Sequence, residues 1–352
     1  MSNALQLNNY KKLISGIMPA KDVPSAGNYI RNYRKKNIVR YTDLQRREAY
    51  VATLETFLRQ YYPGCTLEMH GSCINGFGNK NSDIDLCLKT APFRVEVNHQ
   101  HNTIVHIARI LVTDHCQGVE DATAITETRI PIVDITFKDM KIDLCVNQFV
   151  SIESSKLLRQ YTYCNDRLAG LGLFIKDFVK EMGIDKEHGG FSSFPCILLL
   201  IHYLQHTNPV SLPVLNQYVT SNNESYGDLI LGFFKYFASF NFKDHVVTIN
   251  QHPILTRNAA GFRSPIAIQA PFDVTANVTD GIKDGVAHRI KEIFAKSAKV
   301  LSQPQDRRYG NFMEMLVNKV KLSSFMQLGH QLLALFTLAY YFLIRIPICL
   351  WN

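Results

Sequence analysis

The sequence predicts an α+β protein built in two halves. Up to residue 150, apolar runs of strand length at 65–70, 84–88, 129–137 and 140–146 are interspersed with helical patterns. From residue 151 onward the pattern changes to helix. The chain has 352 residues, of which 46% are hydrophobic and 19% charged. This length and composition allow two domains with separate cores and exclude a disordered protein.

The N-terminal segment is basic. Residues 1–60 contain 11 Lys and Arg against 4 Asp and Glu, and so carry +7 of the formal net charge of +8. Several of these cations alternate with Tyr29, Tyr33 and Tyr41. Basic side chains among aromatic rings suit an RNA backbone with bases to stack, although a solvated helix face has the same pattern. The RNA-binding candidates are Arg31, Arg34, Lys35, Lys36 and Arg40.

A helix is expected next, over residues 42–61, with Thr42 as its N-cap and Pro63-Gly64 after its end. The following strand leads into Gly71-Ser72, a turn whose backbone N–H groups and hydroxyl suit a phosphate. A second strand begins near Asp83, and its alternation places Asp83 and Asp85 on one face. Two adjacent carboxylates repel each other unless a cation such as Mg²⁺ lies between them. We therefore expect a nucleotide–metal site here.

A third carboxylate, Asp143, lies in an Ile-Asp-Leu-Cys run that repeats the one around Asp85. Antiparallel pairing of the two strands would place Asp143 beside Asp83 and Asp85. Three such carboxylates suit two metal ions about 3.5–4 Å apart, which clamp the attacking and leaving oxygens of an in-line displacement. Asp134 is the alternative third carboxylate.

The helical half contains two pairs of residues at i, i+4 spacing. Lys176 and Lys180 share a helix face, where an anion such as a triphosphate would offset their repulsion, and a solvated face is the alternative. His202 and His206 have the spacing of metal ligands but lack an evident third ligand, which disfavours a metal site.

Compartment signals are few. The eight cysteines are scattered without a CxxC pair, which favours a reducing compartment, and the start of the chain has no signal-peptide pattern. We expect a cytoplasmic protein, with the nucleus as the alternative. Residues 332–344 carry no charge, and residues 346–351 continue apolar. A membrane anchor, a buried or amphipathic helix, and a non-native end are the readings left open for this tail.

Several motifs, in one order along the chain, resemble a known family. They are Gly71-Ser72, Gly76-Phe77-Gly78, Ser82-Asp83-Ile84-Asp85-Leu86-Cys87, Asp143, Ile175-Lys176, Lys180, Phe191-Ser192-Ser193-Phe194, Gly227-Asp228-Leu229 and Pro271-Phe272-Asp273 with Asn277. Together they resemble the non-canonical poly(A)/poly(U) polymerases of the DNA-polymerase-beta-like nucleotidyltransferase superfamily, over about residues 40–300. These are terminal uridylyltransferases and cytoplasmic poly(A) polymerases.

The resemblance implies a mixed-sheet catalytic domain at 42–150 and a helical central domain at 151–310, which recruits the basic arm at 1–41; the apolar tail at 323–352 has no counterpart. The nucleoside triphosphate would lie between the two domains. Asp83, Asp85 and Asp143 would hold two Mg²⁺ or Mn²⁺ ions and catalyse transfer. The implied nucleotide contacts are Gly71, Ser72, Ser154, Ser155, Lys176, Lys180, Ser193, Phe194, Asp273 and Ala276.

This chain departs from the family pattern at the base-reading positions. Ser154-Ser155 stands where an Asn-Thr pair is usual, and Phe194 replaces a Tyr. Ala270 replaces an acidic residue, and Ala276 stands where uridylyltransferases often carry a base-selecting His. Asn277, which poly(A)-type members tend to lack, is retained. The balance favours UTP weakly over ATP.

The resulting hypothesis is a template-independent transferase that adds UMP or AMP to RNA 3′ ends. A poly(A) polymerase using mainly ATP and an inactive RNA-binding scaffold are the alternatives. The expected partners are an RNA 3′ end, UTP or ATP and an RNA-binding adaptor protein. We expect a monomer, with membrane contact by the tail disfavoured.

Overall fold

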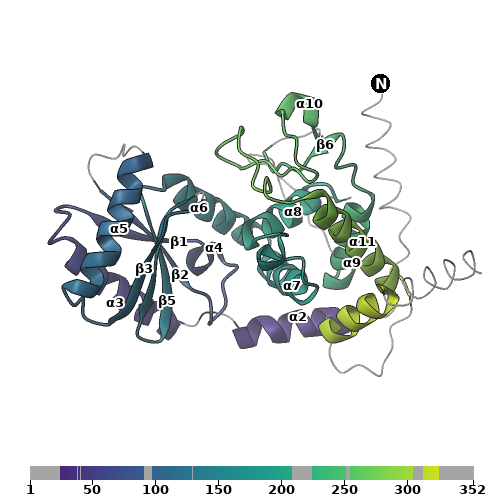
Figure 1. Ribbon diagram of the computed structural model, residues 1–352. Coiled ribbons are helices and arrows are strands. Elements are labelled where there is room, and N and C mark those ends of the chain that lie inside the picture. Colours follow the sequence, from purple (N-terminus) through teal and green to yellow (C-terminus); the bar gives the residue numbers. More distant parts are fainter. Residues whose placement is uncertain are drawn as a thin grey trace, which may run out of the picture.

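The computed structural model describes residues 24–37, 39, 41–90, 97–128, 130–207, 224–250, 254–303 and 312–324. A sheet with its helices forms one half of the molecule, and a bundle of helices forms the other (Figure 1). Each half has its own hydrophobic core. The part of the tail beyond residue 324 and the expected RNA contact Arg40 lie outside the described residues.

The sheet of the first half has five strands in the order β1-β2-β5-β4-β3. Their bounds are β1 Thr66–His70, β2 Ile84–Lys89, β3 Val119–Ile125, β4 Ile132–Phe137 and β5 Met140–Val146. β2 and β5 pair in parallel, whereas the other neighbours pair antiparallel. The antiparallel pairing expected for the two aspartate strands is therefore wrong. The chain between them forms α5 (Val97–Thr113), β3 and β4, and this long connection returns β5 in the direction of β2.

One face of this sheet is covered by α5 and by α3 (Tyr41–Leu58). Ile84, Leu86 and Ile142 point into the core on this side and are fully buried. Because side chains alternate along a strand, the aspartates between them point to the opposite face. α3 begins at Tyr41, so Thr42 lies in its first turn and is not the N-cap.

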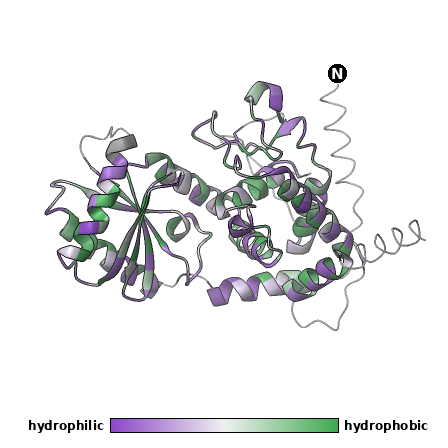
Figure 2. Cartoon of the chain, in the orientation of Figure 1, coloured by the Kyte–Doolittle hydropathy of each residue, from purple (hydrophilic) through white to green (hydrophobic). Residues whose placement is uncertain are grey.

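The second half packs its helices around one large core. Their bounds are α6 Phe149–Cys164, α7 Arg167–Glu181, α8 Ser193–Gln205, α9 Tyr226–Ser239 and α11 Asp284–Leu301. Two segments distant in sequence join this core: α2 (Pro24–Asn37), through Ala26 and Ile30, and the helical residues 312–324. Hydrophobic residues are concentrated in the interior of this bundle, and α2 runs along its edge (Figure 2).

The Asp of the Gly-Asp-Leu motif stabilises the start of α9, and a glycine one turn later allows close packing. Ser225 and Asp228 form a capping box that fixes the start of the helix. A Cβ at Gly232, one turn further on, would lie 2.0 Å from the hydroxyl oxygen of buried Tyr203. The smaller elements are η1 (Lys186–His188), β6 (His245–Val246), β7 (Leu255–Thr256) and α10 (Arg257–Ala260).

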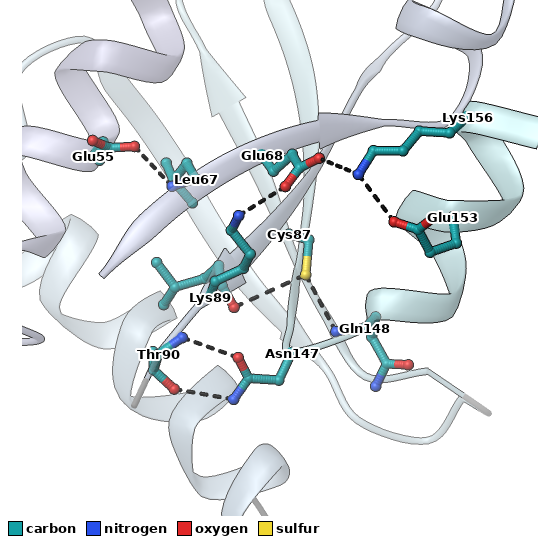
Figure 3. Close-up of polar contacts among 11 residues, drawn as sticks. Glu55, Leu67, Glu68, Cys87, Lys89, Thr90, Asn147, Gln148, Glu153 and Lys156 are labelled. Atoms are coloured by element: carbon teal, nitrogen blue, oxygen red, sulfur yellow. Dashed lines mark hydrogen bonds and ion pairs between the residues drawn. The ribbon is translucent and has the colours of Figure 1, made fainter. Parts of the chain in front are cut away.

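A polar network fastens α6 to the sheet (Figure 3). Lys156 of α6 bonds Glu68 of β1 at 3.3 Å and Glu153 at 3.0 Å, and Lys89 of β2 bonds Glu68 at 2.8 Å. Below it, the Asn147 side chain exchanges two hydrogen bonds with Thr90. These contacts fix the start of α6 relative to β2 and β5. Among the described helices, none has the length and apolar character to span a membrane.

Candidate active site

The three predicted carboxylates lie on the face of the sheet opposite α3 and α5, which α6 covers in part through Ile152. Asp85 on β2 is the register partner of Asp143 on the neighbouring strand β5, so the two side chains lie next to each other. Asp83 comes directly before β2 and shares this face. Asp134, the alternative third carboxylate, is the register partner of Asp143 on β4 and forms an ion pair with Lys141 at 3.5 Å. Four carboxylates therefore gather at this end of the sheet.

Burial and the charge of neighbouring carboxylates raise the pKa values of three of these groups. Burial, followed by the charge of Asp143, raises the pKa of Asp85 to about 6. Burial, followed by the charge of Asp83, raises the pKa of Asp143, and burial with the charge of Asp134 raises that of Asp83. In the described residues no hydrogen bond or ion pair engages the carboxylates of Asp83 and Asp143. The cluster therefore carries a negative charge that an added cation would neutralise.

The donor set fits a hard divalent cation that shares its coordination with a ligand. Across the described ranges, no three His, Cys, Asp or Glu side chains are close enough together to hold an ion by themselves. Mg²⁺ commonly takes one or two protein carboxylates and completes its coordination with substrate phosphates and water. Asp83, Asp85 and Asp143 suit this shared mode.

The Gly71-Ser72 turn lies directly against Asp85. The backbone N–H of Ser72 donates to Asp85 Oδ2 at 3.3 Å. Gly71 has φ +63°, and a Cβ at this position would lie 2.0 Å from the same oxygen. Only glycine combines this backbone conformation with this close approach. The Gly71 N–H is held by Ser155 Oγ at 2.7 Å, so Ser155 supports the turn and its hydroxyl is committed within the protein.

A buried arginine that the sequence did not single out holds the loop between the turn and the aspartates. Arg47 of α3 has no exposed surface. Its guanidinium donates to Cys73 Sγ at 2.7 Å, to the Ser82 carbonyl at 2.8 Å and to the Lys80 carbonyl at 3.3 Å. The Cys73 thiol in turn donates to the Asp83 carbonyl at 3.2 Å. Arg47 therefore fixes both ends of the loop that closes on Asp83.

Asp83 and Asp85 open into a cleft of about 760 Å³ between the two halves, whereas Asp143 lies beside Asp85 and is not part of the lining. This volume lies in the usual range for small-molecule sites. Many of the predicted nucleotide contacts line it as well: Gly71, Ser72, Ser154, Ser155, Lys176, Ser193, Phe194, Asp273 and Ala276. Ala270 lines it as well. The structure thus brings together residues from β2, α6, α7, α8 and the loop before α11.

The two predicted lysines line different pockets. Lys176 Nζ donates to the Phe77 carbonyl at 2.9 Å and lines the cleft, and burial lowers its pKa while the charge of Asp85 opposes this. Lys180, one turn along α7, is exposed and lines a different pocket beside Tyr29 and Tyr33. Four residues advance a helix by about 6 Å. This distance carries Lys180 beyond the cleft, so the structure does not place it with the other nucleotide contacts.

The loop over the cleft is held by Asn277. The buried Asn277 Oδ1 accepts from the Ile268 N–H at 2.9 Å, and Nδ2 donates to Ser264 Oγ. The Ala270 N–H donates to the Ala276 carbonyl at 2.9 Å, which closes the loop. The retained asparagine therefore shapes the loop. The helix α11 begins only at Asp284, because residues 277–282 complete this turn structure.

Two other expected features have structural roles. Tyr29 and Tyr33 of α2 stack on each other, and Tyr29 packs edge-on against Phe174 of the helical core, so each ring already has an aromatic partner within the protein. The exposed cations of α2 are Arg31, Lys35 and Lys36, while Arg34 donates to the Asp166 carbonyl. His202 bonds Thr248 and Tyr236 through its two ring nitrogens, which excludes the metal pair with His206.

The sheet, the helical bundle and the cleft between them define a polymerase-beta-like nucleotidyltransferase fold with a helical associated domain. Two family models match the chain: the central palm domain of mitochondrial-like poly(A) RNA polymerases over residues 27–163, and the Cid1 family poly A polymerase model over residues 225–276. The chain belongs to the non-canonical poly(A)/poly(U) polymerases. The family expected from the sequence is thereby confirmed.

Similar proteins include both poly(A) polymerases and terminal uridylyltransferases. Poly(A) RNA polymerase GLD2 of Mus musculus is 30% identical over 302 residues, which are 75% of this chain and 62% of that protein. Terminal uridylyltransferase 7 of Homo sapiens is 28% identical over 297 residues, 74% of this chain and 20% of that protein. The chain thus spans less than two thirds of the length of these relatives.

Solved structures share the fold. The Cid1 poly(U) polymerase bound to MgATP has a TM-score of 0.71 and 23% identity, covering 84% of this chain and 99% of that chain. The structure of mtPAP in complex with UTP has a TM-score of 0.74 and 18% identity, covering 89% of this chain and 75% of that chain.

Proposed function

We propose that this protein transfers single nucleotides from a nucleoside triphosphate to the 3′ hydroxyl of RNA without a template. The observation that carries this proposal is the register pairing of Asp85 with Asp143, because Asp83 and Asp85 line a cleft that also holds Lys176 and Phe194. A cluster of carboxylates that shares its cleft with a partly buried lysine suits a polyphosphate with its cations. The family relatives named for RNA tailing agree with this chemistry.

The acidic residues would bind two Mg²⁺ or Mn²⁺ ions together with the substrate phosphates. When bound, such ions neutralise the charge of the transferring phosphoryl group and orient the attacking and leaving oxygens. Asp143 is proposed to accept the proton of the RNA 3′ hydroxyl, because it lies beside Asp85 and, within the described residues, its carboxylate makes no hydrogen bond or ion pair.

The remaining polar groups of the cleft would position the triphosphate. The Lys176 ammonium carries a charge at the inner wall of the cleft, held by the Phe77 carbonyl. The Ser72 hydroxyl and the Ser193 hydroxyl at the start of α8 line the same cavity. Catalysis would then arise mainly from orientation and charge neutralisation.

The base would lie between Phe194 and the loop that carries Asp273 and Ala276. Phe194 offers a ring to stack on, but Ala270 and Ala276 offer no side-chain hydrogen-bonding group to the base edge. Strong discrimination requires buried polar groups that one base satisfies and another leaves unpaired. We therefore propose UTP as the preferred substrate by a small factor, less than about tenfold, with ATP also accepted.

The RNA would reach the cleft with help from the exposed cations of α2. In the proposal the protein works as a cytoplasmic monomer, and an RNA-binding adaptor protein selects its targets.

An extension assay tests the proposal. A labelled single-stranded RNA is incubated with the full chain, Mg²⁺ or Mn²⁺ and each of the four nucleotides separately. We expect extension with UTP and, more slowly, ATP, and none by the Asp83→Ala variant. RNA binding without extension by any nucleotide would favour the inactive scaffold, and undiminished extension by Asp83→Ala would exclude this site as the catalytic centre.

A further inference from the structure

A second concave surface lies outside the cleft, on the helical half. It is a hollow of about 700 Å³ that we call the basic hollow. Its lining includes four cations, Lys243, Arg257, Arg263 and Lys291, and the half-exposed ring of Phe262. It is built by the segments around β6 and α10, which project from the helices in Figure 1, and by α11.

Arg257 holds the basic hollow in shape. Its guanidinium donates to the carbonyls of Phe242 at 2.6 Å, Phe262 at 3.2 Å and Pro265 at 3.1 Å. These three carbonyls belong to the two segments that form the walls. The exposed side chains of Lys243 and Arg263 stand on the same walls. The cationic lining is therefore fixed by the backbone around it.

The positive charge of the basic hollow is poorly compensated. Within the described residues, no ion pair involves any of its four cations. One carboxylate, Asp244, acts on Arg257, and it is exposed and bonded to Asn241. Burial, followed by the charge of Arg257, lowers the pKa of Lys291, whose ammonium lies 5.2 Å from the centre of the Phe242 ring. An anion would relieve this repulsion.

The basic hollow is linked to the cleft by a short stretch of chain. Ser264 lines the hollow and bonds Asn277, and Ala270, six residues further, lines the cleft. Six residues span at most about 20 Å. A few nucleotides of single-stranded RNA cover this distance. We propose that the basic hollow binds the phosphate backbone of single-stranded RNA a few nucleotides upstream of the 3′ end, with Phe262 offering a ring for one base.

This inference rests on the proposed function, because it takes RNA as the substrate whose 3′ end occupies the cleft. RNA is favoured over an acidic protein segment because the hollow combines several cations with a partly exposed aromatic ring, the pairing that suits a sugar–phosphate backbone with stacked bases.

Binding measurements test it directly and do not depend on catalysis. The full chain is titrated into fluorescein-labelled RNAs of about 4 and about 15 nucleotides, and anisotropy is followed at several KCl concentrations. Lys243→Glu/Arg263→Glu is compared with a control of the same formal charge change, Lys299→Glu/Lys321→Glu, which alters exposed lysines outside the hollow. Equal thermal unfolding midpoints establish that both variants fold.

We expect the wild type to bind the longer RNA more tightly than the shorter one, and the hollow variant to lose this gain, with a Kd for the longer RNA raised at least tenfold. Its slope of log K against log salt should fall by about 1.4, since each phosphate contact contributes about 0.7 for single strands. A Kd and slope equal to those of the control variant would overturn the proposal.

Two other outcomes are distinguishable. Loss of affinity for a polyglutamate peptide with unchanged RNA affinity would show that the basic hollow takes an acidic protein segment, and would overturn the RNA assignment. If the wild type extends no RNA but the hollow variant still loses RNA affinity as predicted, the proposed function fails and the RNA site stands.

Discussion

Replacing Asp85 by Asn should make the protein more stable at neutral pH while removing its activity. The Asp85 carboxyl has a pKa of about 6 in the folded protein, against an ordinary value of 3.8, because it is buried beside Asp143. Its ionised form therefore costs the folded state free energy. An Asn side chain has the same shape and no charge, so this cost disappears in Asp85→Asn.

The magnitude follows from the pKa difference. About two pKa units correspond to about 3 kcal/mol, and the weaker hydrogen bond from Ser72 to a neutral acceptor offsets part of this. We expect the free energy of unfolding at pH 7.5 to rise by about 2 kcal/mol. In the wild type, the folded state holds the Asp85 proton between about pH 4 and pH 6, where the unfolded chain has released it. The cost is thus fully present above about pH 6 and is lost as the pH falls toward 4, so the gain in Asp85→Asn should be about half as large at pH 5.

Guanidinium denaturation at pH 7.5 and pH 5 measures this difference. The control is Asp121→Asn, on the exposed part of β3 at the far edge of the sheet, which should change the free energy of unfolding by less than about 0.5 kcal/mol. Addition of Mn²⁺ with a nucleoside triphosphate should stabilise the wild type and leave Asp85→Asn unchanged. A lower free energy of unfolding for Asp85→Asn at pH 7.5 would refute the view that the buried, ionised Asp85 destabilises the folded state.

Three further changes test the surroundings of the site. Gly71→Ala should reduce RNA extension at least 100-fold, because the new Cβ meets the Asp85 carboxylate. Gly64→Ala also places a side chain at positive φ, but in open space, and should keep its activity; equal losses would mean that a side chain at positive φ is sufficient for the effect. Arg47→Met should slow extension at least tenfold and raise the Mn²⁺ concentration needed for half-maximal rate, and a metal titration indistinguishable from wild type would deny Arg47 a positioning role. Ala276→His should raise the ratio of UTP to ATP incorporation at least tenfold in a competition assay, and an unchanged ratio would place the base elsewhere.

The sequence predicts the strands of the first half well because they alternate cleanly. The runs before Gly71 and after Asp83 form the strands β1 and β2, as the alternation indicates, and the two strands pair antiparallel. The direction of β5 relative to β2 does not follow from alternation, since a parallel and an antiparallel neighbour can present the same face. It depends on the path of the chain through α5, β3 and β4, which local patterns do not reveal.

The sequence predicts the site residues that lie within a recognisable motif, but not those whose position depends on tertiary contacts. Asp83, Asp85 and Asp143 meet on one face, as their strand positions require. Arg47 escapes prediction because a charge within a helical pattern is normally solvated, and only the folded loop supplies three acceptors for it. The sequence does not reveal that Lys180 lies outside the cleft. Its i, i+4 spacing from Lys176 indicates a shared helix face, but not where the cleft ends along α7.

The most direct test of nucleotidyl transfer at this site compares two RNAs that differ only at the 3′ end. The full chain is given UTP, Mn²⁺ and an RNA with a free 3′ hydroxyl or with a 3′-deoxy end, and pyrophosphate release is measured alongside RNA length. We predict one pyrophosphate for each nucleotide added to the 3′-hydroxyl RNA, and neither product with the 3′-deoxy RNA or with Asp85→Asn. Equal nucleotide incorporation into both RNAs, or incorporation that persists in Asp85→Asn, would contradict transfer to the 3′ hydroxyl by the paired aspartates.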